Sequence, residues 1–192
     1  MASKRTADGG RAQIIEAARC LFAGNGFHQT NMAELAARAS VSVGQIYRLY
    51  AHKTDIIAAI IQIDADQRLA ELQVISDAAL SKAMPIRDAF EELARTVLNQ
   101  GGEALTFQIL AEGHRDANVA AVIARLCERY RELLRGMALL ANDSLEGDRL
   151  ACAGEILLSC LFGLGNRELS RPDLSVDDTA RLAADFFLAA LR

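Results

Sequence analysis

Hydrophobic residues recur along the chain at the three-to-four-residue spacing of amphipathic helices. The first helix is predicted from four such positions, Ile14, Ala18, Leu21 and Phe22. This helix is expected to span about residues 10–23 and to end at Gly24-Asn25-Gly26, because Gly and Asn accept left-handed backbone conformations. The chain therefore begins with an amphipathic helix that is followed by a turn.

Two short helices are predicted next, with a tight turn between them. Asn31 followed by Glu34 has the form of a capping box, and the helix that it begins ends near Ala39. Ser40-Val41-Ser42 makes the connection, and the third helix runs from about Ser42 to Tyr50. Two short helices joined by such a turn have the geometry of a helix-turn-helix.

The rest of the chain keeps the helical pattern. Six further helices are predicted over residues 54–77, 85–99, 103–113, 117–141, 144–168 and 176–191. Thr54 is expected to cap the first of these, Pro85 fits the first turn of the second, and Gly101-Gly102 separates the second from the third. We therefore expect an all-α fold of about nine helices, three in an N-terminal domain of residues 1–53 and six in a body of residues 54–192.

Composition agrees with this fold class. Only 5% of the residues are aromatic and none is tryptophan, which argues against a β-sandwich or a barrel. The chain contains no run of about 18 uncharged apolar residues, so no membrane span is expected. Residues 1–13 lack the apolar core of a secretory signal, and the expected location is the cytosol.

Charge divides the chain into two parts. Residues 1–53 carry seven Lys or Arg against three Asp or Glu, whereas residues 54–192 carry fourteen against twenty-two. A basic N-terminal part on an acidic body suggests that the first part meets a polyanion. The excess of four positive charges is small, however, and chance is the alternative explanation.

No catalytic or metal-binding motif is present. The four cysteines, Cys20, Cys127, Cys152 and Cys160, show no C-x-x-C spacing and no neighbouring histidine pair, so free, buried thiols are expected and no metal or cofactor. The chain also lacks a nucleophile elbow and a phosphate-binding loop. We therefore do not expect an enzyme.

The third helix carries the candidate chemistry. Ile46, Leu49 and Tyr50 are expected to face the first two helices, so the opposite arc is exposed. On that arc Gln45 can read an adenine edge and Arg48 a guanine edge, while Gly44 lets the helix approach the floor of a DNA groove. Phosphate oxygens suit Tyr47 and Lys53, as well as the backbone N–H groups at Asn31. The candidate DNA-contacting residues are Asn31, Ser42, Val43, Gly44, Gln45, Tyr47, Arg48 and Lys53.

Residues 22–57 resemble the DNA-binding region of the tetracycline-repressor (TetR) family of bacterial regulators. The matching positions are Phe22, Gly26, Phe27, Thr30, Leu35, Ala36, Val41, Ser42, Gly44, Ile46, Tyr47, Tyr50 and Lys53. The resemblance implies a homodimeric regulator that binds an inverted-repeat DNA operator through the helix-turn-helix. It also implies an effector pocket in the C-terminal body and release of the operator when a small molecule binds.

Three residues depart from the pattern of the family. Ser40 stands where glycine is usual, Val43 replaces a commonly polar residue, and Ala33 offers no long side chain to the groove. Sequence specificity would then rest more on Gln45, on Arg48 and on a basic N-terminal arm. That arm contains Lys4, Arg5 and Arg11, and a solvated tail is the alternative for it.

The last two predicted helices are apolar nearly all round and must be covered on more than one side. Such faces typically pack two helices from each subunit into a four-helix interface. The candidate interface residues are Leu157, Cys160, Leu161, Leu164, Leu182 and Phe186. An intramolecular core is the alternative for the same residues.

The middle helices offer candidates for a small-molecule pocket. They are Phe107, Gln108, His114, Cys127, Tyr130, Arg131 and Phe162, and ordinary core or surface placement is the alternative for each. A mostly apolar pocket of this kind would suit a small aromatic or lipophilic ligand. The rival function is a helical ligand-binding or protein-interaction module whose helix-turn-helix no longer binds DNA.

Overall fold

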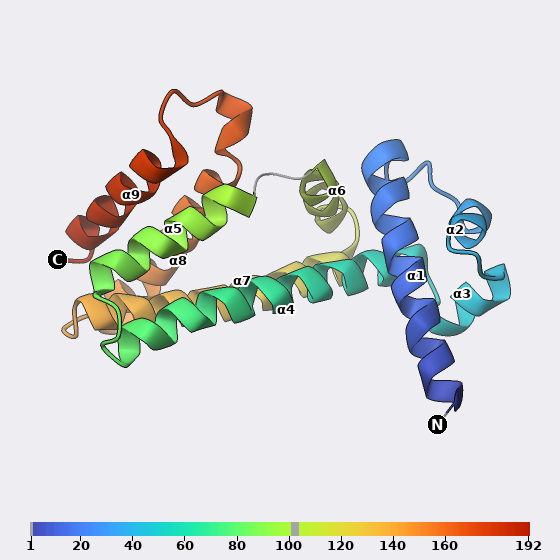
Figure 1. The fold of residues 1–192 in the computed structure, drawn as a ribbon, viewed down its shortest axis with the longest axis horizontal. Helices are drawn as coiled ribbons and strands as arrows, with labels where there is room; N and C mark the ends of the chain where they lie inside the picture. Colours follow the sequence, from blue (N-terminus) through green and yellow to red (C-terminus); the bar gives the residue numbers. More distant parts are fainter. Residues whose placement is uncertain (1, 101–103) are drawn as a thin grey trace. The chain divides into compact units, whose positions relative to one another are not determined.

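The computed structural model describes residues 2–100 and 104–192, with side chains from 9 to 100 and from 105 to 192. These residues form nine α-helices, one 3-10 helix and no strand (Figure 1), which confirms the all-α fold. The helices are α1 (Ala2–Asn25), α2 (Met32–Arg38), α3 (Val43–Leu49), α4 (Lys53–Leu80), α5 (Ile86–Gln100), α6 (Ala104–Gly113), α7 (Ala117–Ala141), α8 (Gly147–Gly165), the 3-10 helix η1 (Arg167–Ser170) and α9 (Val176–Ala190).

Helix boundaries differ from the expected ones where local capping chemistry decides them. α4 begins at Lys53 because the carboxylate of Asp55 accepts a hydrogen bond from the backbone N–H of His52 at 2.8 Å. Thr54 is therefore inside the helix, and its predicted capping role is wrong. The expected break at Gly101-Gly102 lies outside the described residues.

The chain packs into two compact units that interleave in sequence. One comprises Met1–Ala65 and Glu103–Ala124, and the other comprises Asp66–Gly102 and Arg125–Arg192. α4 and α7 contribute residues to both units. This division by packing differs from the division by role expected from the sequence, because α6 packs with the N-terminal helices.

The first unit is held by a core around α1. Ile14, Phe22, Leu35 and Ile46 are fully buried and bring α1, α2 and α3 together, and further buried isoleucines come from the start of α4. The ring of Phe27 meets Phe22 edge-on, with 5.2 Å between centroids. This packing fixes the turn between α1 and α2 on the same core that carries α3.

The second unit has its core among five helices. Buried apolar residues of α4, α5, α7, α8 and α9 form one cluster, in which Phe90 and Phe187 lie with ring centroids 6.0 Å apart. α5 is strongly amphipathic and buries Ala89, Phe90 and Leu93. Helices α5 and α9 lie side by side in this unit (Figure 1).

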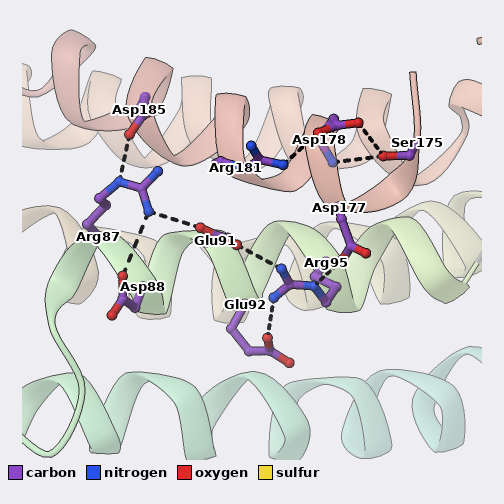
Figure 2. A network of polar contacts seen from close by, with 10 residues as sticks. All are labelled: Arg87, Asp88, Glu91, Glu92, Arg95, Ser175, Asp177, Asp178, Arg181 and Asp185. Carbon is purple, nitrogen blue, oxygen red and sulfur yellow. Dashed lines mark hydrogen bonds and ion pairs between the residues drawn. The ribbon is translucent and has the colours of Figure 1, made fainter. Parts of the chain in front are cut away.

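A polar network joins the exposed edges of α5 and α9, as Figure 2 shows. Glu91 accepts hydrogen bonds from both Arg87, at 2.9 Å, and Arg95, at 2.7 Å. Each arginine also reaches α9, Arg87 at Asp185 and Arg95 at Asp177. The hydrogen bonds from Arg95 and Arg87 lower the pKa of Glu91.

Two further observations concern expectations from the sequence. Among the described residues, none of the helices has a stretch long and apolar enough to cross a membrane. Cys127 and Cys160 are partly buried, but Cys20 and Cys152 are exposed, so the expectation of four buried thiols is wrong for these two. The sulfur of Cys20 accepts a hydrogen bond from Arg38 of α2 at 2.7 Å, and Cys152 lines a surface groove between α8 and α9.

Candidate nucleic-acid interface

Side-chain caps define the two helices of the helix-turn-helix. The side-chain oxygen of Asn31 accepts a hydrogen bond from the backbone N–H of Glu34 at 2.9 Å, which caps α2. The hydroxyl of Ser42 accepts one from the backbone N–H of Gln45 at 3.1 Å, which caps α3. Both helices therefore begin at fixed residues, and α3 starts directly after the turn.

The turn between α2 and α3 contains a left-handed residue. Ser40 has a φ of 55°, in the region that glycine adopts without a steric penalty. The backbone N–H of Val41 then bonds to the carbonyl of Ala36 at 3.0 Å, which closes the end of α2. Serine thus adopts a left-handed conformation at the position where the resemblance leads us to expect glycine.

α3 presents an exposed arc on the side away from the core. Ile46 is fully buried, and Leu49 and Tyr50 are partly buried against the other helices. The exposed residues are Ser42, Val43, Gly44, Tyr47 and Arg48, with Tyr47 at 53% and Val43 at 38% relative exposure. Gln45 is only partly exposed, because its side chain lies against α1.

Lys53 is engaged within the protein. Its ammonium group donates to the backbone carbonyls of Phe27, His28 and Thr30, the last at 2.8 Å. It also lies 4.4 Å from the centroid of the Phe27 ring. Burial lowers the pKa of Lys53, and the charge of Glu112 opposes that shift. This side chain therefore holds the turn that precedes α2.

α6 contacts the same turn from a distant part of the sequence. The side-chain oxygen of Gln108 accepts a hydrogen bond from the backbone N–H of Phe27 at 2.8 Å. The buried carboxylate of Glu112 lies 3.1 Å from Nε2 of His28. Two polar groups of α6 are thus bonded to the segment that leads into α2.

The basic arm is described only in part. α1 begins at Ala2, so the backbone of the arm is helical and the helix starts eight residues before the expected start. The side chains of Lys4 and Arg5 lie outside the described residues. Arg11 is exposed. Burial of Tyr50 raises the pKa of its hydroxyl, and the positive charge of Arg11 opposes that shift.

The candidate pocket residues divide between the two units. Phe107, Gln108 and His114 belong to the first unit, and Cys127, Tyr130, Arg131 and Phe162 belong to the second. Gln108 is bonded to the turn before α2, and Arg131 pairs with Glu128 at 2.8 Å. Tyr130 and Cys127 are partly buried, and this burial raises the pKa of both side chains. His114 and Phe162 are exposed.

The candidate interface residues divide between core and surface. Leu157 and Leu161 are buried in the second unit within one chain, at 3% and 5% relative exposure, and Cys160 and Leu164 are packed against the same core. Leu182 and Phe186 are exposed at 57% and 76%. Ile156 and Phe186 line a surface groove between α8 and α9.

Two buried residues, Thr30 and Gly10, support the helix-turn-helix in ways that the sequence did not predict. Thr30 is buried, and its hydroxyl donates to the carbonyl of Gly26 at 3.0 Å, inside the turn that Lys53 and Gln108 hold. Gly10 lies under the side chain of Gln45. The signal for Gly10 was its spacing of four from Ile14 and eight from Ala18, which places it on the buried face of α1.

Comparisons with known proteins agree with this geometry. The model of the tetR family of bacterial regulatory proteins matches residues 14–60. The HTH-type transcriptional regulator UidR of Escherichia coli K12 is 25% identical over 182 residues, which are 91% of this chain and 86% of that protein.

Solved structures show the same fold along nearly the whole chain. Salmonella enterica GusR is similar with a TM-score of 0.69 at 25% identity, covering 95% of this chain and 93% of that one. FadR from Bacillus subtilis in complex with stearoyl-CoA has a TM-score of 0.71 at 16% identity, covering 93% and 98%. The helix-turn-helix thus lies inside the segment that matches the tetR family of bacterial regulatory proteins, and nearly the whole chain is similar to the transcriptional regulator UidR in sequence and to GusR in fold.

Proposed function

We propose that this protein is a transcriptional repressor that binds an inverted-repeat operator as a homodimer and leaves it when a small molecule binds. The observation that carries the proposal is the exposed arc of α3, which faces away from the core of the first unit. An exposed helix of this kind fits the major groove, where Gln and Arg side chains distinguish base pairs. A cytosolic location and the absence of catalytic activity belong to the same proposal.

The residues divide by role within this proposal. Gln45 and Arg48 read base edges, and Gly44 lets α3 approach them. Tyr47 and the N-terminus of α2 at Asn31 meet phosphates, which fix the register of the protein without reading sequence. Ser42 caps α3, and Val43 lies at the border of the arc, where it offers an apolar contact.

The homodimer is supported by the apolar side chains that α8 and α9 leave exposed. Ile156, Leu182 and Phe186 are each more than half exposed in a single chain. Exposed apolar groups that share a surface mark an interaction site, and a second copy of the chain would cover them. In this proposal Leu157 and Leu161 support the interface from the core below it.

Selection of DNA duplexes from a random library with the purified full-length protein tests the DNA-binding proposal. We expect an inverted repeat, and an affinity that falls steeply as salt rises. Gln45→Ala and Arg48→Ala should each relax preference at particular base pairs, at a cost of about 1–3 kcal/mol. The matched controls are Gln67→Ala and Arg125→Ala, both exposed outside the helix-turn-helix.

A library that yields no enriched duplex would overturn the proposal. It would leave the rival function, a ligand-binding or protein-interaction module with a helix-turn-helix that does not bind DNA. A selected operator whose sequence stays the same in both Gln45→Ala and Arg48→Ala would keep DNA binding but overturn the assignment of the reading residues.

The effector is the second part of the proposal. A protein of the same fold, Bacillus subtilis FadR, is described in complex with stearoyl-CoA, so an acyl-CoA is a reasonable first probe. By thermodynamic linkage, a ligand that weakens operator binding must bind the operator complex more weakly than the free dimer, by the same factor. Calorimetric titration of the probe into both forms measures this factor, and equal affinities would exclude that probe as an effector.

A further inference from the structure

Gly10 on α1 and Gln45 on α3 lie in direct contact within the first unit. A Cβ atom added at Gly10 would lie 2.8 Å from Nε2 of Gln45, which is closer than two such atoms can approach. The side-chain amide of Gln45 therefore occupies the space that any other residue at position 10 would fill. The backbone of Gly10 is buried at this point.

Of the two adjacent glycines in α1, Gly10 alone lies against the side chain of Gln45. The neighbouring Gly9 is exposed and has no atom within 4 Å of the position that its Cβ would take. A glycine in the interior of a helix costs about 0.5–1 kcal/mol relative to alanine, so both glycines weaken α1 to a similar extent. Only Gly10 has a packing reason for the missing side chain.

The contact bears on how Gln45 meets a base. A glutamine side chain has several rotatable bonds, and a bidentate contact with a base requires one orientation of its amide. Packing of the amide on the Cα of Gly10 restricts that orientation before DNA is bound. The atom that a larger residue would displace is the far end of this flexible side chain, so the backbones of α1 and α3 can stay in place.

We propose that Gly10 is a specificity-determining residue for DNA binding, which acts by holding the Gln45 amide on the surface of α1. The inference rests on the proposed DNA-binding function and extends it to a residue outside the helix-turn-helix. Gly10 sets the orientation in which the amide of Gln45 meets the base edge. A side chain at position 10 changes which base is preferred there and leaves the other positions of the operator unchanged.

The test compares Gly10→Ala with Gly9→Ala in the full-length protein. Both substitutions add one methyl group and raise the helix propensity of α1, so they are matched in chemistry and in helix propensity, and only the one at position 10 meets Gln45. We expect Gly9→Ala to select the wild-type operator. Gly10→Ala should alter the preferred base at one position in each half-site and weaken binding to the wild-type operator about five-fold or more, which corresponds to one bidentate contact.

A second comparison assigns the effect to Gln45. In a Gln45→Ala background the amide is gone, so adding Gly10→Ala should change neither the selected sequence nor the affinity. The inference is overturned if Gly10→Ala behaves like Gly9→Ala in the wild-type background. It is also overturned if Gly10→Ala has the same effect with and without Gln45.

A readout without DNA separates this inference from the proposed function. The side-chain amide of Gln45 gives a pair of resonances in a two-dimensional nitrogen–proton NMR spectrum, identified by their loss in Gln45→Ala. These resonances should shift in Gly10→Ala and stay in place in Gly9→Ala. If the wild-type protein selects no duplex, the proposed function is wrong. If it selects a duplex and the Gln45 amide resonances do not shift in Gly10→Ala, only the role of Gly10 is wrong.

Discussion

Gln108 accepts a hydrogen bond at 2.8 Å from the backbone N–H of Phe27, a residue 81 positions earlier in the chain. Phe27 follows Gly26, whose φ of 87° places it in the left-handed region, so this N–H belongs to a turn rather than to a helix. The bond joins α6 to the segment that leads into the helix-turn-helix. A residue expected to line a pocket thus supports the candidate DNA-binding surface.

Replacing Gln108 by leucine should loosen the turn before α2. The substitution keeps the volume but removes the acceptor, and a partly buried donor left without its partner costs about 1–3 kcal/mol. Hydrogen exchange measures the effect directly: the amide of Phe27 should exchange faster, while that of Leu35 inside α2 should change little. Gln108→Glu retains an acceptor and should restore most of the protection; equal exchange at Phe27 in all three proteins would contradict this role.

Glycine at position 40 should stabilise the protein. The left-handed conformation costs a residue with a Cβ about 1–2 kcal/mol, and glycine avoids this cost. The greater freedom of glycine in the unfolded chain offsets about 0.4–1 kcal/mol of the gain. We expect Ser40→Gly to raise the free energy of unfolding of the first unit by roughly 0.5–1 kcal/mol in urea titrations. Ser40→Ala keeps the strain and should be nearly neutral; an equal gain in both variants would show that φ is not the cause.

Lys53 can support DNA binding in two ways, by holding the turn before α2 or by contacting a phosphate directly, and a substitution separates them. Its three backbone partners occupy the ammonium group in the free protein, so we expect Lys53→Met to lower stability and to weaken binding to all DNA sequences alike. A lost phosphate contact would also reduce the slope of log affinity against log salt by about 0.9. We expect this slope to stay unchanged, because the side chain holds the turn. A slope reduced by about 0.9 would instead support the direct phosphate contact expected from the sequence.

Local pattern was sufficient for the features that depend on neighbours in sequence. The spacing of Ile46, Leu49 and Tyr50 predicted which side of α3 is buried, and the pattern over 117–141 gave both ends of α7. The position of Asn31 before Glu34 predicted the cap of α2. In each case the information lies within a few residues along one helix.

Contacts between distant segments could not be predicted in the same way. Gln108 and Phe27 carry no sequence signal that pairs them, so the place of α6 in the first unit was missed. An apolar face also looks the same whether its own chain or a second copy covers it. Leu157 and Leu182 were therefore grouped together, although the first is buried and the second is exposed.

The polar network on α5 gives the stability of the second unit a dependence on pH. Hydrogen bonds from Arg95 and Arg87 lower the pKa of Glu91 in the folded protein, whereas the unfolded chain has the ordinary glutamate value. Between these two values the unfolded state binds more protons, so stability falls as the pH falls through this window. Glu91→Gln should flatten the decrease in melting temperature below about pH 4.5. Glu92→Gln, which removes a carboxylate bonded to Arg95 alone, is the control, and identical profiles for both variants would contradict the role of Glu91.

Phe186 offers the sharpest test of the proposed dimer, because it is 76% exposed in a single chain. A charge at that position leaves the monomer core intact but would be buried without a partner in a two-chain interface, which is strongly destabilising. We therefore expect Phe186→Glu to stay folded by circular dichroism and to sediment as a monomer. Val74→Glu, on α4, places the same charge at an apolar residue that is 69% exposed and should sediment as a dimer. Leu161→Glu cannot replace this test, because Leu161 is 5% exposed and its substitution would disrupt the core of its own chain. A dimeric Phe186→Glu would place the interface on another surface.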